Sequence, residues 1–280
     1  MDLAGQRPRW PIAEPEEFRA ELQRWIANNW DVQVTVGEWW DRLAAAGLTA
    51  PTWPRSQGGL AATTAIQAVI EEELANIGAI APPVMGLGIR MIGAAIRQFA
   101  TPEQFEEVIP RLLTGRNLWT ALMNEPGIDD PAMTACVAEF DWKYVTLNGT
   151  KTCPDLAATH AILLARSARG SVSRDGLSWF LMDLEFHPVD LASGTVTFRD
   201  VQLLHDRVLG NRDDGWTLAK TILPFNERSL VGRIRRGLVH VESGTKAGNL
   251  VRVVGDVLAE ARARALAKAS AAGAVDRRRG

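Results

Sequence analysis

The stretch that decides the fold runs from residue 118 to residue 158 and reads LWTALMNEPGIDDPAMTACVAEFDWKYVTLNGTKTCPDLAA. Residues before it show the spacing of amphipathic helices, whereas those after it, up to about 207, alternate with the period of strands. The tetrapeptide NEPG at 124–127 follows an apolar run and predicts the end of a strand. The pair Asn148-Gly149 predicts a tight turn between two strands, because both residue types tolerate a positive φ.

Helical patterns fill the chain before this stretch. Glu14-Pro15 predicts a helix start, because acidic residues suit the positive end of the helix dipole. Thr101-Pro102 predicts another start, with a hydroxyl cap followed by proline in the first turn. Further apolar periods predict one helix that ends before Gly47 and two more at residues 63–77 and 84–99.

Short strands and a return to helices complete the pattern. The strand-like segments, whose spacing favours a small β-barrel, lie at residues 144–147, 161–165, 177–182 and 195–198. From Gly215 the pattern is helical again, and a final weakly amphipathic helix is expected at 258–272. The predicted class is therefore α+β, with an N-terminal helical domain at 1–117, a central small β-barrel at 118–212 and a shortened C-terminal helical domain at 213–280.

The composition limits the classes of function. The chain has 280 residues, of which 46% are hydrophobic, enough for a sizeable core. Its 31 Lys and Arg nearly balance 33 Asp and Glu, so no field of one sign points to nucleic acid or a membrane surface. Two cysteines form no disulfide framework, and no apolar run is long enough for a membrane span. We therefore expect a cytoplasmic protein.

Five motifs in a fixed order carry a family resemblance. In chain order they are the APTWP with Gly58-Gly59 at 50–59, the EPG at 125–127, the NGTK at 148–151, the GNRDDGW at 210–216 and the NER at 226–228. In this order they resemble the acyl-CoA dehydrogenases. The resemblance implies the helical, barrel, helical architecture of that family, with a C-terminal helical domain shorter than the family's.

The same resemblance implies a reaction, a cofactor and partners. Acyl-CoA dehydrogenases bind FAD and remove two hydrogens from Cα and Cβ of an acyl-CoA thioester. A carboxylate takes the α-proton and flavin N5 takes the β-hydride. Family members assemble as dimers or tetramers with FAD at a subunit boundary, so a homo- or hetero-oligomer is implied.

The departures from the family pattern gather where the flavin binds. By resemblance, the cofactor-binding positions are Met123, Asn124, Cys153 and Asp155. Cys153 replaces the aromatic residue that stacks by the flavin ring, and Asp155 replaces a hydroxyl near N5. Asp129 and Asp130 replace the glycine and serine that help to cradle the cofactor, and two carboxylates repel a pyrophosphate.

The candidate catalytic residues are also carboxylates. Glu227 immediately precedes Arg228, the place where a minority of the family has its catalytic glutamate, and Asp155 is the alternative base. The resemblance further places Asp130 and Arg228 at the substrate. The competing interpretation is that Glu227 is an ion-paired surface residue and that the three aspartates are solvated loop acids.

Three functions remain open at this level. The first is a subunit of a hetero-oligomeric FAD-dependent acyl-CoA dehydrogenase of lipid metabolism, with the intact flavin half-site supplied by a partner. The second is a flavin-independent enzyme in which Glu227 or Asp155 performs acid–base chemistry α to a thioester, such as dehydration or isomerisation. The third is a non-catalytic partner subunit. The four histidines lack metal-ligand spacing, so no metal is expected.

Overall fold

The computed structural model describes residues 7–79, 88–128, 130–154, 158–187, 190–192 and 194–222. These residues belong to two compact units. The smaller unit contains residues 10–39 and 64–79, and the larger contains residues 7–9, 40–63 and the described residues from 88 to 222. The division into three domains predicted from sequence stays a prediction.

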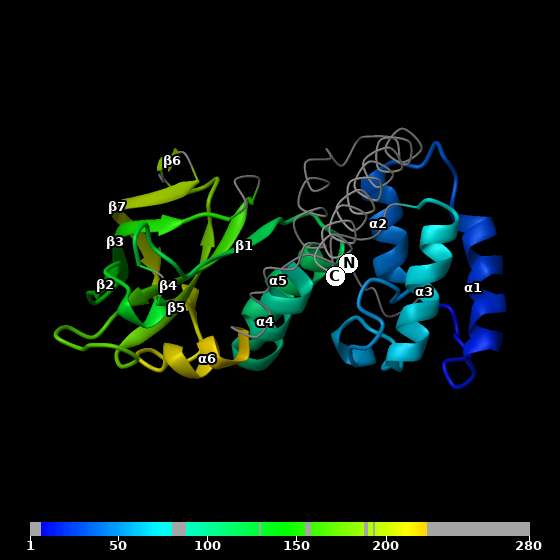
Figure 1. Ribbon diagram of the computed structural model, residues 1–280, viewed down its shortest axis with the longest axis horizontal. Coiled ribbons are helices and arrows are strands. Elements are labelled where there is room, and N and C mark those ends of the chain that lie inside the picture. Colours follow the sequence, from blue (N-terminus) through cyan, green and yellow to red (C-terminus); the bar gives the residue numbers. More distant parts are fainter. Residues whose placement is uncertain are drawn as a thin grey trace, which may run out of the picture. The chain divides into compact units, whose positions relative to one another are not determined.

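The smaller unit is helical. Helices α1 (Pro15–Asn29) and α3 (Thr64–Asn76) pack together, and α2 (Val36–Ala45) begins in this unit (Figure 1). Phe18, Leu22 and Ile26 form the buried face of α1, at the helical spacing expected from the sequence. Arg19 of α1 donates to Glu72 at 2.9 Å and also to Glu73, whose carboxylate accepts from Gln23 at 2.9 Å. This network fixes α1 against α3.

The larger unit joins helices to one eight-stranded sheet (Figure 1). Its helical elements are α4 (Ala94–Phe99), α5 (Pro102–Leu113), α6 (Gly215–Ile222) and the π-helix η3 (Gly88–Gly93), with 3-10 turns at η1 (Arg55–Gln57), η4 (Pro131–Met133) and η5 (His205–Arg207). The strands are β1 (Trp119–Leu122), β2 (Val137–Phe140), β3 (Tyr144–Thr152), β4 (His160–Arg166), β5 (Leu177–Asp183), β6 (Asp190–Ala192), β7 (Thr195–Leu204) and β8 (Val208–Leu209). The predicted strands and the helices starting at Pro15 and Pro102 are confirmed.

The sheet has the order β6-β7-β3-β2-β4-β5-β8, and β1 pairs in parallel with β4. Successive residues of β4 and β5 enter two different cores. Leu163 and Phe180 lie in the core enclosed by the sheet, whereas Leu164 and Trp179 face the core shared with the helices. Both faces of these strands are therefore buried, which explains their nearly continuous apolar runs.

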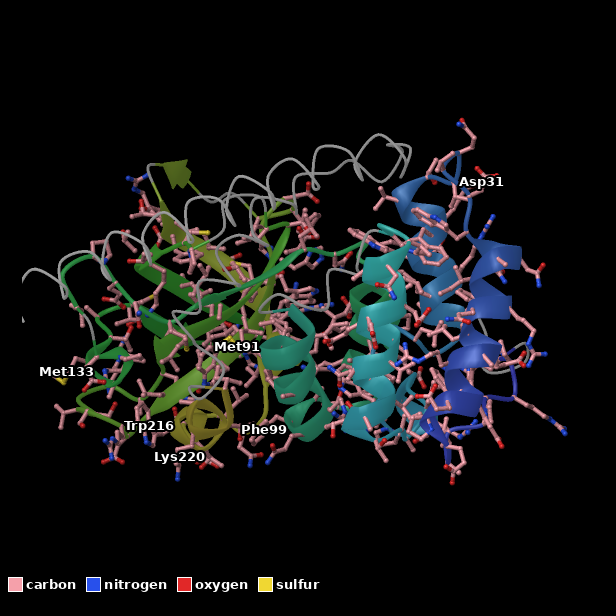
Figure 2. All side chains as sticks on the ribbon, turned by 45° about the vertical axis from the view of Figure 1, so that its right-hand side comes forward. Asp31, Met91, Phe99, Met133, Trp216 and Lys220 are labelled. Atoms are coloured by element: carbon pink, nitrogen blue, oxygen red, sulfur yellow. The ribbon has the colours of Figure 1, made fainter. Side chains whose placement is uncertain are left out.

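The helix-side core packs α4, α5 and α6 against β1, β4 and β5. Met91 is fully buried within it, whereas Phe99 of α4 and Trp216 of α6 pack at its edge (Figure 2). The indole of Trp179 donates to the carbonyl of Gly215 at 2.8 Å and so attaches the start of α6 to β5.

Thr101 is the N-cap of α5, as expected from Thr101-Pro102, and the structure adds a capping box with Gln104. The Thr101 hydroxyl accepts from the Gln104 amide, and the Gln104 side chain accepts from the Thr101 amide at 3.0 Å. Gln104 also donates to the carbonyls of Asp206 and Val208 at 2.6 and 2.9 Å. One side chain thus caps a helix and ties it to η5 and to the start of β8.

The tight turn predicted at Asn148-Gly149 is wrong. Strand β3 continues through both residues and carries a bulge against β7 between Leu147 and Gly149. Gly149 has φ 141°, and a Cβ there would lie 2.7 Å from the Cα of Cys136. The Asn148 side chain exchanges two hydrogen bonds of 2.9 Å with Asp200, which has a positive φ on β7. The residues that suit a turn here serve a bulge instead.

Candidate functional site

The ends of β1 and β3 meet at the position that the motifs predicted for a cofactor. The amide of Thr152 donates to the carbonyl of Asn124 at 2.8 Å, and the amide of Cys153 donates to the carbonyl of Gly194 at 2.8 Å. These bonds bring the predicted positions Met123, Asn124 and Cys153 to adjoining chain ends. Met123 and Cys153 are buried, and Asn124 is half-buried.

Asn124 has an unsatisfied acceptor. Its Oδ1 atom is buried and has no hydrogen-bond partner among the described residues. A buried polar atom without a partner is costly, so native proteins normally satisfy it. The side chain is therefore suited to receive an N–H or O–H donor from a ligand or from another part of the assembly.

The residue after Asn124, Glu125, belongs to a buried ion pair that the sequence reasoning missed. Lys151 is fully buried, and its ammonium donates to Glu125 Oε1 at 2.8 Å, to the Met123 carbonyl at 3.0 Å and to the Thr134 hydroxyl at 2.6 Å. The Glu125 carboxylate also accepts from the Thr134 hydroxyl and from the amides of Ala135 and Cys136, each amide at 2.9 Å. The signal in the sequence was a lysine at an inward position of a strand, which demands a carboxylate nearby.

The surroundings set the charge states of this group. Burial raises the pKa of the Glu125 carboxyl, but hydrogen bonds from Lys151 and Thr134 outweigh burial and leave that pKa below its usual value. Burial lowers the pKa of Lys151, although the hydrogen bond and the negative charge of Glu125 oppose this shift. Burial raises the pKa of the Cys136 thiol to about 12, so this cysteine is not a thiolate nucleophile at neutral pH.

The Asp130 side chain is hydrogen-bonded to the backbone of its own loop. Its side chain is exposed, and its Oδ1 accepts from the Ala132 amide at 2.9 Å, which caps the short helix η4. Arg166 donates to the Ala132 carbonyl at 2.9 Å and to the carbonyls of Ser173 and Asp175 at 3.1 and 2.9 Å. This arginine clamps the segment after the EPG turn to the β4–β5 loop, and Met133 of that segment is exposed (Figure 2).

Several predicted site residues lie outside the described residues. They are Asp129, Asp155, Glu227 and Arg228. Their proposed roles as base, cofactor ligand or substrate ligand stay predictions. Met123, Asn124 and Cys153 are brought together, whereas Asp130 lies on a separate loop, where its side chain caps η4.

The described residues do not fit a complete FAD site. Asn124 offers a free acceptor to the polar edge of a ring system, in agreement with a flavin. Cys153, however, is 5% exposed and packs into the core enclosed by the sheet, so it presents no flat face for stacking. Asp130 holds a carboxylate on the N-terminal amide of η4, where it repels a pyrophosphate. We therefore derive no chemical step through FAD from this chain.

Within the part of the chain that the structure describes, no three His, Cys, Asp or Glu side chains are grouped to hold a metal ion. The described helices include none with the length and apolarity needed to cross a bilayer.

A helical region followed by a sheet of this topology, with the EPG turn and the Lys151 strand meeting at one end, defines an acyl-CoA dehydrogenase type of fold. Comparisons with known proteins agree. Residues 14–116 match the protein-family profile described as "Acyl-CoA dehydrogenase, N-terminal domain". Acyl-CoA dehydrogenase IpdE1 of Mycobacterium tuberculosis (strain ATCC 25618 / H37Rv) is 32% identical over 244 residues, which cover 76% of this chain and 63% of that protein.

Solved structures support the fold alone, because their identity is low. The "Tcur3481-Tcur3483 steroid ACAD G363A variant" matches with a TM-score of 0.61 and 21% identity, covering 90% of this chain and 69% of that one. The ChsE4-ChsE5 complex from Mycobacterium tuberculosis matches with a TM-score of 0.59 and 22% identity, covering 92% and 76%. The comparisons thus confirm the resemblance to the acyl-CoA dehydrogenases that the motifs predicted, and the chain spans less than two thirds of the length of IpdE1.

Proposed function

We propose that this chain is one subunit of a hetero-oligomeric, FAD-dependent acyl-CoA dehydrogenase that introduces a double bond between Cα and Cβ of an acyl-CoA thioester. A partner subunit supplies the stacking and pyrophosphate contacts of the flavin. This chain supplies the end of β1, with Asn124 as a hydrogen-bond acceptor.

The observation that carries this proposal is that one part of the predicted cofactor site suits a flavin and another part does not. Asn124 has an unsatisfied acceptor in the place where the motifs predict a cofactor, whereas Cys153 and Asp130 lack the chemistry to complete the flavin site. A site shared between two different subunits accounts for both facts, because each chain then needs only part of the ligand set.

The similar structures support a two-protein assembly. Their descriptions name two proteins each, Tcur3481 with Tcur3483 and ChsE4 with ChsE5. One of them is described as a steroid ACAD, so we propose a steroid-derived acyl-CoA as the substrate class. The catalytic base is proposed to come from the partner or from Glu227 of this chain.

The test is co-purification with a partner. The chain is expressed alone and together with each acyl-CoA dehydrogenase-like protein encoded beside its gene, and the visible spectrum and mass of each product are measured. We expect flavin absorption only in a product that contains both proteins, and reduction of that flavin on addition of a steroid-derived acyl-CoA.

A matched pair of variants locates the contribution of this chain. Asn124→Ala in the complex is expected to lower the fraction of flavin retained after gel filtration, because the ring loses an acceptor. Asn211→Ala changes an exposed asparagine in the loop before α6 and is expected to retain the wild-type fraction. A folded chain that binds none of these proteins, or complexes that never contain flavin, would contradict the proposal.

A further inference from the structure

We propose that Lys151 is a positioning residue: its buried ammonium fixes the main chain at Met123 and thereby holds the Asn124 side chain at the end of β1 in one orientation. The meaning of that orientation for a ligand rests on the proposed function. The positioning itself does not, and it can be measured on the chain alone.

The hydrogen bonds of Lys151 join three segments. Its ammonium has three protons, and the three acceptors are the Met123 carbonyl on β1, the Glu125 carboxylate in the EPG turn and the Thr134 hydroxyl before β2. The group is fully buried, so no donor is left for water. A satisfied network of this kind permits a single arrangement of the segments that it joins.

The segment fixed in this way is centred on Asn124. Lys151 Nζ holds the carbonyl of the preceding residue, Met123, at 3.0 Å. The next residue of β3, Thr152, holds the carbonyl of Asn124 itself at 2.8 Å. The side chain of the following residue, Glu125, is held by Lys151 and by the amides of Ala135 and Cys136. Three consecutive residues are therefore restrained, and the central one presents the unsatisfied acceptor.

Stability alone does not account for this pair. Replacing a buried ion pair with well-packed apolar residues is often neutral or stabilising, because removing two charges from water is costly. Lys151 lies on β3, whose other inward positions, such as Leu147 and Val145, are apolar and fully buried. An apolar pair could fill the same space, but it could not fix the backbone from Met123 to Glu125 through hydrogen bonds, as the two charged side chains do.

The test uses a variant that removes both charges together. Lys151→Met alone leaves a buried unpaired carboxylate and endangers folding, so the informative variant is Lys151→Met with Glu125→Gln. Glutamine keeps one of the two acceptor oxygens, so it can retain the bond from the Cys136 amide but loses the bond that the Ala135 amide makes to the other oxygen. Thr134→Val is the matched control, since it removes one acceptor of Lys151 but leaves the bond to Met123.

The readouts are amide hydrogen exchange and the NMR signals of two asparagine side chains. In the double variant we expect the Thr152 amide, bonded to Asn124, to exchange roughly tenfold faster or more. We also expect the side-chain NH2 signals of Asn124 to broaden or split. In the same variant the Leu184 amide, bonded to Thr159 at 2.8 Å, and the side-chain signals of Asn148 are expected to stay as in the wild type.

Either of two results would overturn the proposal. One is an unchanged Thr152 exchange rate and an unchanged Asn124 signal in the folded double variant. The other is an equal change at Leu184 and Asn148, which would indicate a general loss of stability. Since both readouts use the chain alone, a failure to find a flavin-containing complex would refute the proposed function and leave this result standing.

Discussion

Removing the ammonium of Lys151 is expected to have the largest effect on stability of any single change near the site. Lys151→Met leaves the Glu125 carboxylate at 8% exposure without its charge partner. Removing one partner of a buried pair typically costs about 3–5 kcal/mol. Since domains are stable by only about 5–15 kcal/mol, this loss is a large share of the total free energy of unfolding.

The dependence on pH distinguishes a lost ion pair from a simple packing defect. In the wild type the pKa of Glu125 lies below its usual value. The pair therefore stabilises the fold fully above the unfolded pKa of glutamate, about 4.3, and this contribution is lost as the pH falls through the folded pKa. In Lys151→Met the carboxylate is buried without a cation, so protonation relieves the cost and the difference between variant and wild type shrinks toward acid pH.

The assay is urea unfolding followed by circular dichroism at several pH values from 4 to 8, with Lys151→Met, Glu125→Gln and the double variant. We expect the double variant to be more stable than the sum of the two single effects by about 1–3 kcal/mol, because the partners are in direct contact. If Lys151→Met lowers the free energy of unfolding by less than about 1 kcal/mol at pH 7, or by an amount that does not change with pH, the reasoning is refuted.

Three further predictions concern the rest of the larger unit. Gly149→Ala is expected to destabilise by about 1–3 kcal/mol, since its Cβ would lie 2.7 Å from the Cα of Cys136; thermal unfolding checks this, and an unchanged melting temperature would contradict it. Gln104→Ala is expected to lower the free energy of unfolding by about 2 kcal/mol and Thr101→Ala by about 1 kcal/mol, because Gln104 also donates to two carbonyls. Equal shifts of the urea midpoint in the two variants would argue against this dual role of Gln104. Burial lowers the pKa of His160, so stability is expected to fall as the pH drops below about 6.5, and His160→Gln should flatten that slope between pH 5 and 8.

The motifs predicted the architecture because each depends on local chemistry. The capping box at Thr101, the strand end at NEPG and the apolar runs of β4 and β5 follow from residue types within a few positions of one another. The prediction failed at Asn148-Gly149, because a bulge and a turn need the same backbone freedom. Only the distant partners, Asp200 and Cys136, decide between them.

The candidate site was predicted in part for the same reason. The positions of Met123, Asn124 and Cys153 followed from the motifs, and the structure brings them to adjoining strand ends. The pairing of Lys151 with Glu125 joins residues 26 apart in the chain, and no local rule indicates it. The clamp of Arg166 on the Ala132 carbonyl spans 34 residues and was likewise beyond local reasoning.

The long-range pairing of the sheet has a consequence for biosynthesis. Strand β1 pairs in parallel with β4, so Trp119 has no partner until His160 has been made, and β3 pairs with β7 only after Thr195 to Leu204 have left the ribosome. Pairing between distant segments slows folding, whereas helices such as α1 and α3 depend mainly on nearby residues. During synthesis β1 and β3 therefore lack these partners until β4 and β7 have been made, and in this interval the nascent chain is prone to aggregate or to need a chaperone.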